Sequence, residues 1–243
     1  MVKKVETRIP KIIHYVWVGE KPKYELVKKC IDSWKKNCKD YKIIEWNEKN
    51  YDLSRLPKVI KQAYKDRKWA FVADYIRLDI LYNFGGVYLD TDMLLIKSID
   101  ELLKYDFFIA KEKEDRLSAG VVGSIKKHFF LRKVLDEYKS LDELDTIPRI
   151  ITRIYKSLND KIRKKKIKVL SIESFYPLPF EKRKDNYMKY ITEKTYGVHL
   201  WDYSWQHPLH KFLERIHLWK PIISLLEITK IKKPLKKILK IKF

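Results

Sequence analysis

The sequence predicts an α/β fold with a mostly parallel sheet. Short stretches rich in β-branched and aromatic residues alternate with stretches of helical periodicity along the chain, and such alternation is typical of parallel strands flanked by helices. The 243 residues are enough to bury a sizeable core. No linker rich in Gly, Ser or Pro and no internal repeat divides the chain, so one domain is the simplest organisation.

The expected elements follow one another in an order that suits this fold. Apolar stretches predict strands over residues 11–18, 41–46, 87–90, 107–111, 120–124 and 167–172. Apolar residues at helical spacing predict helices over residues 24–38, 56–66, 70–84 and 129–140. Ligands of such sheets bind beyond the carboxyl ends of strands, so we expect a site after the strands at 11–18 and 87–90.

The segment from Trp69 to Leu94 carries the strongest functional signal. Gly85 and Gly86 follow the helix at 70–84, and Gly ends a helix at little cost because it readily adopts the left-handed conformation. Side chains alternate along the strand that comes next. Asp90 and Asp92 are therefore expected to project from one face.

Two neighbouring carboxylates can share one divalent cation. Their oxygens suit Mg²⁺ or Mn²⁺, and Mg²⁺ prefers one or two carboxylates together with water and substrate phosphates. An isolated Asp-x-Asp pair also fits a solvated strand end, because it arises by chance roughly once in a few hundred residues. Upstream, Asp74 and Arg77 form either a surface ion pair or an acceptor and a fixed donor for a polar ligand.

Three sequence blocks together resemble a known family. They are IPKIIHYVWVG at residues 9–19, ADYIR at 73–77 and GGVYLDTD at 85–92. In this order and spacing they are similar to the DXD-containing sugar transferases of glycosyltransferase family 32. This family includes initiating mannosyltransferases and capsular-polysaccharide transferases, with distant similarity to clostridial glucosylating toxins. Weaker resemblance extends the match to roughly residues 9–206.

The resemblance implies a GT-A fold, which is a Rossmann-like α/β sandwich that binds a nucleotide sugar. It also implies metal-dependent transfer of a hexose from a UDP- or GDP-hexose to a glycan or lipid-linked acceptor, with retention, as in bacterial-type surface polysaccharide synthesis. A metal and cationic donors would stabilise the charge that grows on the departing diphosphate. No residue is an obvious nucleophile by spacing, which favours same-face substitution in which the departing phosphate accepts the acceptor's proton.

Matching positions give expected roles for the residues after the first strand. The resemblance implies that Trp17 stacks on the nucleotide base and that the backbone of Val16 and Val18 forms hydrogen bonds with it. A tryptophan buried in the core is the competing interpretation. Base stacking would suit uridine and guanosine alike, so the nucleotide stays open.

The resemblance also implies roles for the charged residues. Asp74 and Arg77 match residues that contact the donor's sugar hydroxyls and phosphate. Asp90 matches an aspartate near the ribose and the metal, and Asp92 matches the more direct metal ligand. Asp74, Arg77 and Asp92 are thus the expected catalytic residues.

The C-terminal part of the match supplies further candidates. His199 is expected to contact the metal or the diphosphate, with a structural histidine as the alternative, and Ser204 and Trp205 are expected to close over the phosphates. The segments 117–120 and 146–152 depart from the family pattern. Both are expected to border the donor-sugar and acceptor pockets, so the identity of the sugar is left open.

The net charge of +22 is the second informative feature. This charge suggests nucleic acid as a partner. No nucleic-acid-binding motif accompanies the charge, so we do not expect a nucleic-acid partner. From Arg215 onward, Lys alternates with Ile, Leu, Trp and Phe. This predicts a catalytic domain at residues 1–206 and a basic amphipathic helical tail at 207–243 that contacts an anionic membrane surface, or else a helix packed on the domain. Residues 161–168 add to this basic surface or form a charged loop.

Cysteine usage and the N-terminus suggest a location. Cys30 and Cys38 lie on one expected helix, about 12 Å apart along its axis, which is too far for a disulfide. The first residues lack an apolar signal core and no stretch approaches the roughly 20 apolar residues of a membrane span. We therefore expect a cytoplasmic protein, peripheral at the inner face of the cell membrane. The alternative function is a basic membrane- or nucleic-acid-binding protein with an inactive transferase-like core.

Overall fold

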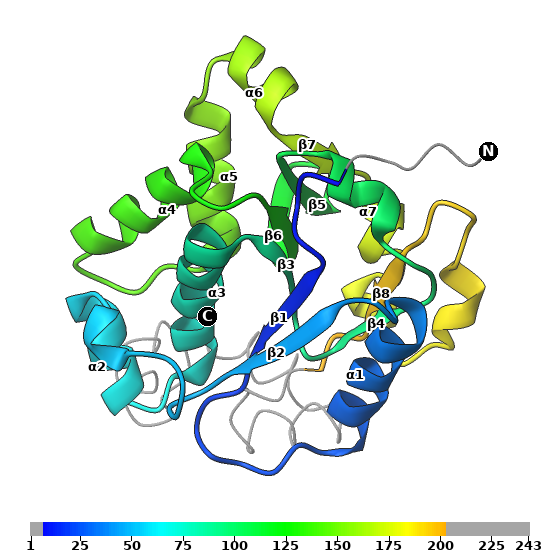
Figure 1. The fold of residues 1–243 in the computed structure, drawn as a ribbon, viewed down its shortest axis with the longest axis horizontal. Helices are drawn as coiled ribbons and strands as arrows, with labels where there is room; N and C mark the ends of the chain where they lie inside the picture. The colour runs from blue at the N-terminus through cyan, green and yellow to red at the C-terminus, as the bar shows by residue number, and fades with distance from the viewer. Residues whose placement is uncertain (1–6, 203–243) are drawn as a thin grey trace, which may run out of the picture. The chain divides into compact units, whose positions relative to one another are not determined.

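A computed structural model describes residues 7–202, which belong to one compact unit. Its centre is a six-stranded sheet of order β2-β1-β3-β6-β5-β7 (Figure 1). The strands of this sheet are β1 (Ile12–Val16), β2 (Lys42–Trp46), β3 (Gly86–Leu89), β5 (Phe107–Lys113), β6 (Arg116–Ser124) and β7 (Lys168–Leu170). The expected domain boundary at residue 206 and the tail at 207–243 lie outside the described residues.

The sheet is mixed because one strand runs against the others. β1 pairs in parallel with β2 and β3, and β7 pairs in parallel with β5. β6 lies between β3 and β5 and is antiparallel to both. The expectation of a mostly parallel sheet is therefore correct for every strand of this sheet except β6.

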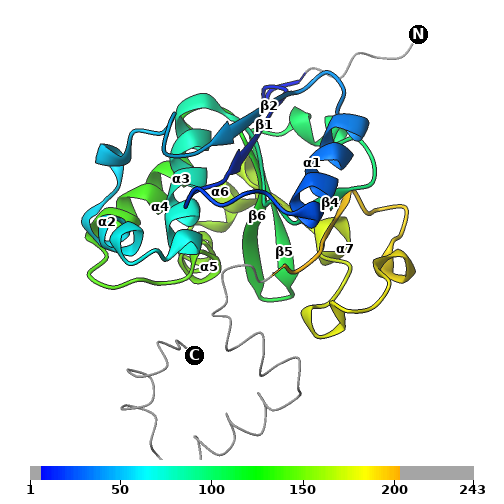
Figure 2. The same cartoon turned by 90° about the horizontal axis from the view of Figure 1, so that it is seen from below.

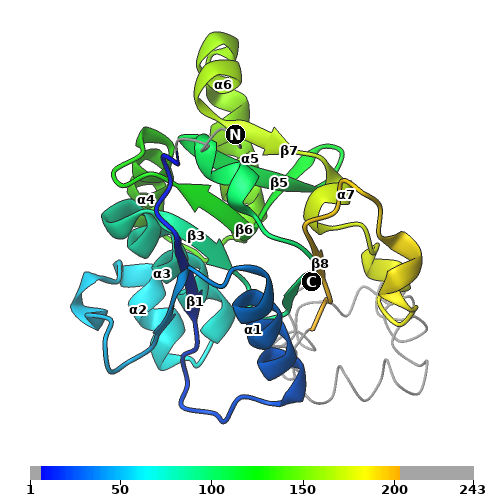
Figure 3. The same ribbon diagram turned by 45° about the vertical axis from the view of Figure 1, so that its right-hand side comes forward.

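Helices and a small second sheet cover the two faces. One face packs against α2 (Lys58–Lys65), α3 (Trp69–Phe84), α4 (Phe129–Ser140) and α5 (Ile147–Ser157). The other packs against α1 (Glu25–Asn37), α7 (Ile172–Phe175) and a two-stranded sheet of β4 (Met93–Leu95) and β8 (Gly197–His199). Figure 3 turns α7, β8 and the side of α1 toward the viewer. Apolar side chains thus cover the sheet on both faces, as expected for largely parallel strands.

The sequence did not predict several short elements. These are β4, β8, α5, α6 (Asp160–Lys166), α7 and the 3₁₀ turns Leu53–Arg55, Asp100–Lys104, Phe180–Lys182 and Tyr187–Tyr190. The charged-loop interpretation of residues 161–168 is wrong, because α6 occupies most of this segment. The helix starts at Asn159, whose side chain accepts a hydrogen bond from the Lys161 N–H at 2.9 Å.

The junction between α3 and β3 is built as the two glycines predict. Gly85 ends α3 with φ of 68°, and Gly86 has φ of 103°. A Cβ on Gly86 would lie 2.7 Å from the carbonyl oxygen of Ile12, so no other residue allows β1 and β3 to approach this closely. His14 on β1 is buried, with Nε2 2.8 Å from the Gly85 carbonyl oxygen and Nδ1 accepting from the Trp46 indole at 3.0 Å.

Two further expectations concern the cysteines and the membrane. Cys30 and Cys38 are both buried and unbridged, as expected. Within residues 7–202, every helix is too short or too polar to cross a bilayer.

Candidate active site

The expected metal-binding carboxylates lie in the turn between β3 and β4. The Asp90 N–H donates to the Gly120 carbonyl at 2.8 Å, and the Met93 N–H donates back to the Asp90 carbonyl at 2.9 Å. Asp90 and Asp92 therefore converge because the chain turns, and the expectation that they share one face of a strand is wrong. β3 already ends at Leu89.

The small second sheet brings His199 to these carboxylates. Met93 on β4 pairs with His199 on β8, and the Leu200 N–H donates to the Asp92 carbonyl at 2.9 Å. The Nε2 atom of His199 lies 3.2 Å from Asp92 Oδ1 and 3.8 Å from Asp90 Oδ2. One potential ligand atom from each of the three residues lies within 4.8 Å of the others. The structure thus joins residues that are distant in the chain into one cluster.

Arg77 braces this cluster from α3. Its guanidinium donates to Asp74 Oδ1 at 2.9 Å, to Asp90 Oδ1 at 3.0 Å and to the Ala119 carbonyl at 2.9 Å. The Arg77 and Asp74 side chains are only 7% and 13% exposed, so the interpretation as a surface ion pair is wrong. The guanidinium also lies 4.5 Å above the ring of Tyr88, whose hydroxyl donates to Asp90 Oδ1 at 3.0 Å. Asp90 is therefore held in one orientation.

Burial and charge act in opposite directions on the cluster. Burial raises the pKa of Asp74 to about 6, although the Arg77 charge opposes this shift. Burial also raises the pKa of Asp92, and the neighbouring Asp90 charge adds to the rise. For Asp90 the burial effect is overcome, because Arg77 and His199 lower its pKa. Burial by itself would lower the pKa of His199, but Asp92 and Asp90 raise it.

These residues fit a divalent metal ion. Two carboxylates and one imidazole converge, and both groups bind divalent cations. Three aspartates share the centre with Arg77 as the only permanent cation among the charged groups just described. A bound dication would stabilise the charged form of Asp92, whose pKa is raised by burial and further by the neighbouring Asp90 charge. Asp90, Asp92 and His199 would hold it.

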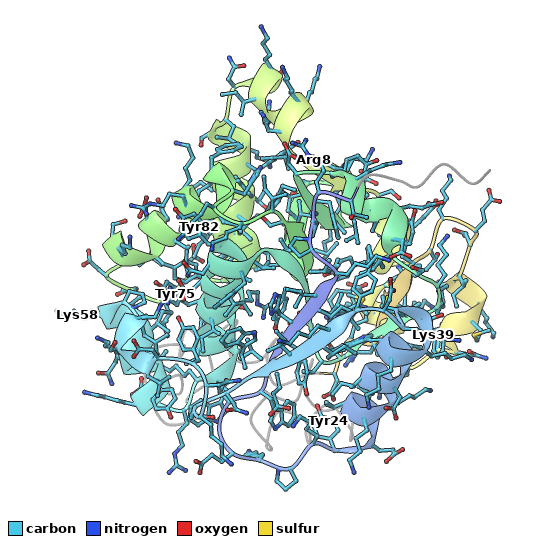
Figure 4. The ribbon with its side chains drawn as sticks, viewed as in Figure 1. Arg8, Tyr24, Lys39, Lys58, Tyr75 and Tyr82 are labelled. Atoms are coloured by element: carbon cyan, nitrogen blue, oxygen red, sulfur yellow. The ribbon has the colours of Figure 1, made fainter. Side chains whose placement is uncertain are left out.

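Trp17 follows the last residue of β1 directly. Val16 is the last residue of β1 and is buried, whereas Trp17 and Val18 are partly buried. The Trp17 ring is 6.0 Å from that of Tyr24, which precedes α1 (Figure 4). Trp17 thus borders the core without being enclosed in it. The base-stacking role of Trp17, with the backbone of Val16 and Val18, stays a prediction.

Asp202 connects Tyr24 to the cluster. The Tyr24 hydroxyl donates to the Asp202 carboxylate, and the Asp202 N–H donates to Asp92 Oδ2 at 2.8 Å. The aromatic residues after β1 and the carboxylates after β3 therefore belong to one connected site. Ser204 and Trp205 lie outside the described residues, so their expected phosphate contacts stay predictions.

Sequence reasoning missed the roles of Gly120, Tyr176 and Glu112. A Cβ on Gly120 would lie 2.5 Å from Tyr176 Oη and 2.7 Å from Asp90 Oδ2, so this position must be glycine for the two side chains to meet. Tyr176 also packs against His199, with ring centroids 5.3 Å apart. Burial raises the pKa of Glu112, although Ser118 and Arg116 stabilise its charge. Gly120 lies in the departing segment 117–120, which contacts Asp90 and Arg77. That this segment and 146–152 border the donor-sugar and acceptor pockets stays a prediction.

Family models match two parts of the chain. The glycosyltransferase sugar-binding region containing the DXD motif matches residues 24–109. The conserved region of alpha-1,4-glycosyltransferases matches residues 126–214. The first includes Asp74, Arg77, Asp90 and Asp92, and the second includes His199, so the two models together contain every member of the cluster.

Curated proteins and solved structures are also similar to this chain. A human alpha-1,4-N-acetylglucosaminyltransferase is 27% identical over 58% of the chain and 45% of its own length. A Saccharomyces cerevisiae mannosyl phosphorylinositol ceramide synthase is 34% identical over 58% of the chain and 37% of its own length. The chain therefore spans less than half of these relatives. The PaToxG glycosyltransferase structure superposes with a TM-score of 0.51 at 19% identity, over 64% of this chain and 72% of that one, which supports the fold.

The fold is similar to that of GT-A enzymes, and the sequence around the cluster matches the sugar-binding region that contains the DXD motif. The matches to the DXD region, to the alpha-1,4-glycosyltransferase region and to mannosyltransferase relatives place the chain more narrowly. The chain resembles glycosyltransferase family 32, whose DXD motif implies a divalent metal.

Proposed function

We propose that the protein transfers a hexose from a nucleotide sugar, a UDP- or GDP-hexose, to a hydroxyl group of a glycan or lipid-linked saccharide. The observation that supports this most is the convergence of Asp90, Asp92 and His199 at the carboxyl edge of the sheet. Mn²⁺ or Mg²⁺ bound there would neutralise charge on the departing diphosphate. Surface polysaccharide synthesis is the process that such a transferase would serve.

The residues around the metal cluster have distinct proposed tasks. The guanidinium of Arg77 contacts Asp74, Asp90 and the Ala119 carbonyl. Arg77 therefore orients Asp90 and adds positive charge behind the diphosphate. Asp74 accepts a hydrogen bond from a hydroxyl group of the donor sugar, through the carboxylate oxygen that Arg77 does not contact. Trp17 receives the base at the end of β1. These groups are fixed before the substrate binds, which is the arrangement that favours electrostatic stabilisation of a transition state.

We propose retention of anomeric configuration by same-face substitution. The departing phosphate accepts the proton of the acceptor hydroxyl while that oxygen forms the new bond to the anomeric carbon. Measurement of the anomeric coupling of the first-formed product by NMR tests this step. An inverted product would contradict it.

Asp92→Asn tests the proposed activity. The variant loses one negative oxygen ligand at nearly constant volume, so donor turnover should fall by at least 100-fold, in the range typical for loss of a metal ligand or its support. Asp142→Asn, at an exposed carboxylate in the loop before α5, is the matched control. Release of nucleoside diphosphate from a panel of UDP- and GDP-hexoses is the readout. Full activity of Asp92→Asn would contradict the metal assignment, whereas no turnover of any donor by the wild-type protein would favour the rival, a binding protein with an inactive core.

We further propose that the protein is peripheral at the inner face of the cell membrane, where a lipid-linked acceptor would be presented. The tail at 207–243 is the first expected contact, and α6 supports a second. The segment 156–168 carries many cations and one anion, namely Lys156, Lys161, Arg163, Lys164, Lys165, Lys166 and Lys168 against Asp160. Ile162 in α6 is 44% exposed. Basic side chains around an exposed apolar residue suit an anionic lipid surface.

Vesicle sedimentation tests the membrane proposal. Replacement of Lys161, Lys164 and Lys165 by Glu should weaken binding to vesicles that contain phosphatidylserine, and deletion of residues 215–243 should weaken it further. Replacement of the three exposed lysines Lys28, Lys35 and Lys36 on α1 by Glu is the charge-matched control. Equal sedimentation of all these proteins would contradict the proposal.

A further inference from the structure

The β5–β6 hairpin continues past the point where the rest of the sheet ends. Leu89 at the end of β3 pairs with Val121 on β6. Beyond it, Lys111 still pairs with Leu117, and Lys113 pairs with Arg116. Figure 2 shows β5 and β6 extending together from the body of the sheet. The hairpin therefore forms a wall beside the carboxyl edge where Asp90 and Asp92 lie.

One face of this wall points toward the metal cluster. The Cβ direction of Gly120 leads to Asp90 and Tyr176. Ser118 shares this face because its side chain is hydrogen-bonded to Tyr176, and Arg116 lies two residues away from it on the same strand. The intervening Leu117 and Ala119 belong to the apolar core beneath α3 and α5 on the opposite face. Gly120, Ser118 and Arg116 thus form a row along β6 that leads outward from the cluster.

A bulge places Glu112 on the same row. The register of β5 shifts between Lys111 and Lys113, so Glu112 is the extra residue, and bulges often re-aim a side chain beside an active site. Its carboxylate is hydrogen-bonded to Ser118 and lies 3.5 Å from the Arg116 guanidinium. The Glu112 side chain is only 12% exposed, whereas that of Arg116 is 45% exposed. A buried carboxylate whose cationic partner is as distant as Arg116 lowers the stability of the fold, unless a bound ligand also forms hydrogen bonds with it.

The chemistry of this row suits a sugar. Glu112 accepts hydrogen bonds and carries a negative charge, so it repels a diphosphate and favours neutral hydroxyl groups. The buried Tyr176 hydroxyl is hydrogen-bonded to Ser118 and lies close enough to feel the Glu112 charge. A carboxylate that accepts hydrogen bonds and a hydroxyl that can donate and accept them can together bond to the hydroxyl groups of a sugar.

We propose that Glu112 binds saccharide hydroxyl groups beside the metal cluster and so helps to select the sugar. This inference rests on the proposed glycosyl transfer. The hydroxyl groups belong either to the donor hexose or to the acceptor, and both present the same chemistry to the carboxylate. Loss of a hydrogen bond to a charged group weakens binding roughly 10- to 100-fold.

The test compares Glu112→Gln and Glu112→Ala with Glu114→Gln in full-length, metal-loaded protein. Glu114 is the matched control because its side chain, at the tip of the same hairpin, is 86% exposed. Hydrolysis of the nucleotide sugar without acceptor gives the donor KM, and transfer to methyl mannoside or methyl galactoside gives the acceptor KM. Calorimetry with the nucleoside diphosphate alone reports on the rest of the site.

The expected result is a 10- to 100-fold rise in one of the two KM values for both Glu112 variants. A rise in the donor KM assigns the donor hexose, and a rise in the acceptor KM assigns the acceptor. Affinity for the nucleoside diphosphate and the kinetics of Glu114→Gln should stay unchanged. Unchanged KM values, or a parallel loss of diphosphate binding that marks a structural role, would overturn the inference alone. A wild-type protein that turns over no nucleotide sugar would overturn the proposed function as well.

Discussion

Replacement of Arg77 by Met should destabilise the folded protein because it leaves two buried carboxylates without their cation. Arg77 contacts Asp74 at 2.9 Å and Asp90 at 3.0 Å, and its side chain is 7% exposed. Removal of one partner from a buried ion pair costs about 3–5 kcal/mol. Asp74 already has a pKa of about 6 and can take up a proton, so we expect the lower end of this range.

Urea denaturation at pH 7.5 in EDTA measures this loss directly. For a domain of this size, about 3 kcal/mol corresponds to a fall in Tm of roughly 6–12 °C. Arg132→Met is the matched control, because Arg132 forms a solvent-exposed pair with Asp136 across one helical turn, and loss of such a pair should change the stability little. Addition of Asp74→Asn to Arg77→Met should recover part of the stability. Equal losses for Arg77→Met and Arg132→Met would refute this account of the buried network.

Three further predictions follow from burial and close approach. Burial lowers the pKa of His14 and His128 to about 4. In the unfolded chain a histidine has a pKa near 6.5, so the contribution of both neutral rings to stability is complete above pH 6.5 and is lost as the pH falls toward 4. In an NMR titration both rings should remain neutral at pH 5.5, and a titration midpoint near 6.5 would contradict the burial. Gly120→Ala should push Tyr176 and Asp90 apart and weaken Mn²⁺ binding at least 10-fold by calorimetry, and wild-type affinity would exclude the close contact. Burial raises the pKa of the Cys30 thiol to about 12, so an aromatic disulfide reagent should react with it only after unfolding, and fast reaction of the native protein would argue against this packing.

Local signals explain why much of the fold could be predicted. The amphipathic period of α1 and α4 and the glycines after α3 gave these helices within a residue or so of their ends. The strands β1, β2 and β3 were found because each contains neighbouring β-branched, aliphatic or aromatic residues that favour strands. These features depend on neighbours in sequence, and a single chain displays them without further information.

The parts that could not be predicted depend on contacts between distant segments. β4 and β8 have three residues each and exist because they pair with one another, so neither carries a periodic signal. The same pairing sets His199 beside Asp92. The bulge at Glu112 is equally invisible in the sequence, because it is defined by the register of β5 against β6. Asp90 and Asp92 were correctly chosen as a pair, yet a turn, and not strand alternation, brings them together.

Metal-dependent nucleotide binding tests the central claim most directly. Thermal unfolding of the wild-type protein and of Asp92→Asn should be recorded with UDP, GDP and CDP, each with and without Mn²⁺ or Mg²⁺. A ligand that binds only the native state raises Tm by mass action. The account predicts a rise with one nucleotide that requires the metal and is lost in Asp92→Asn. No rise with any nucleotide, or a rise that is the same without metal and in Asp92→Asn, would contradict it.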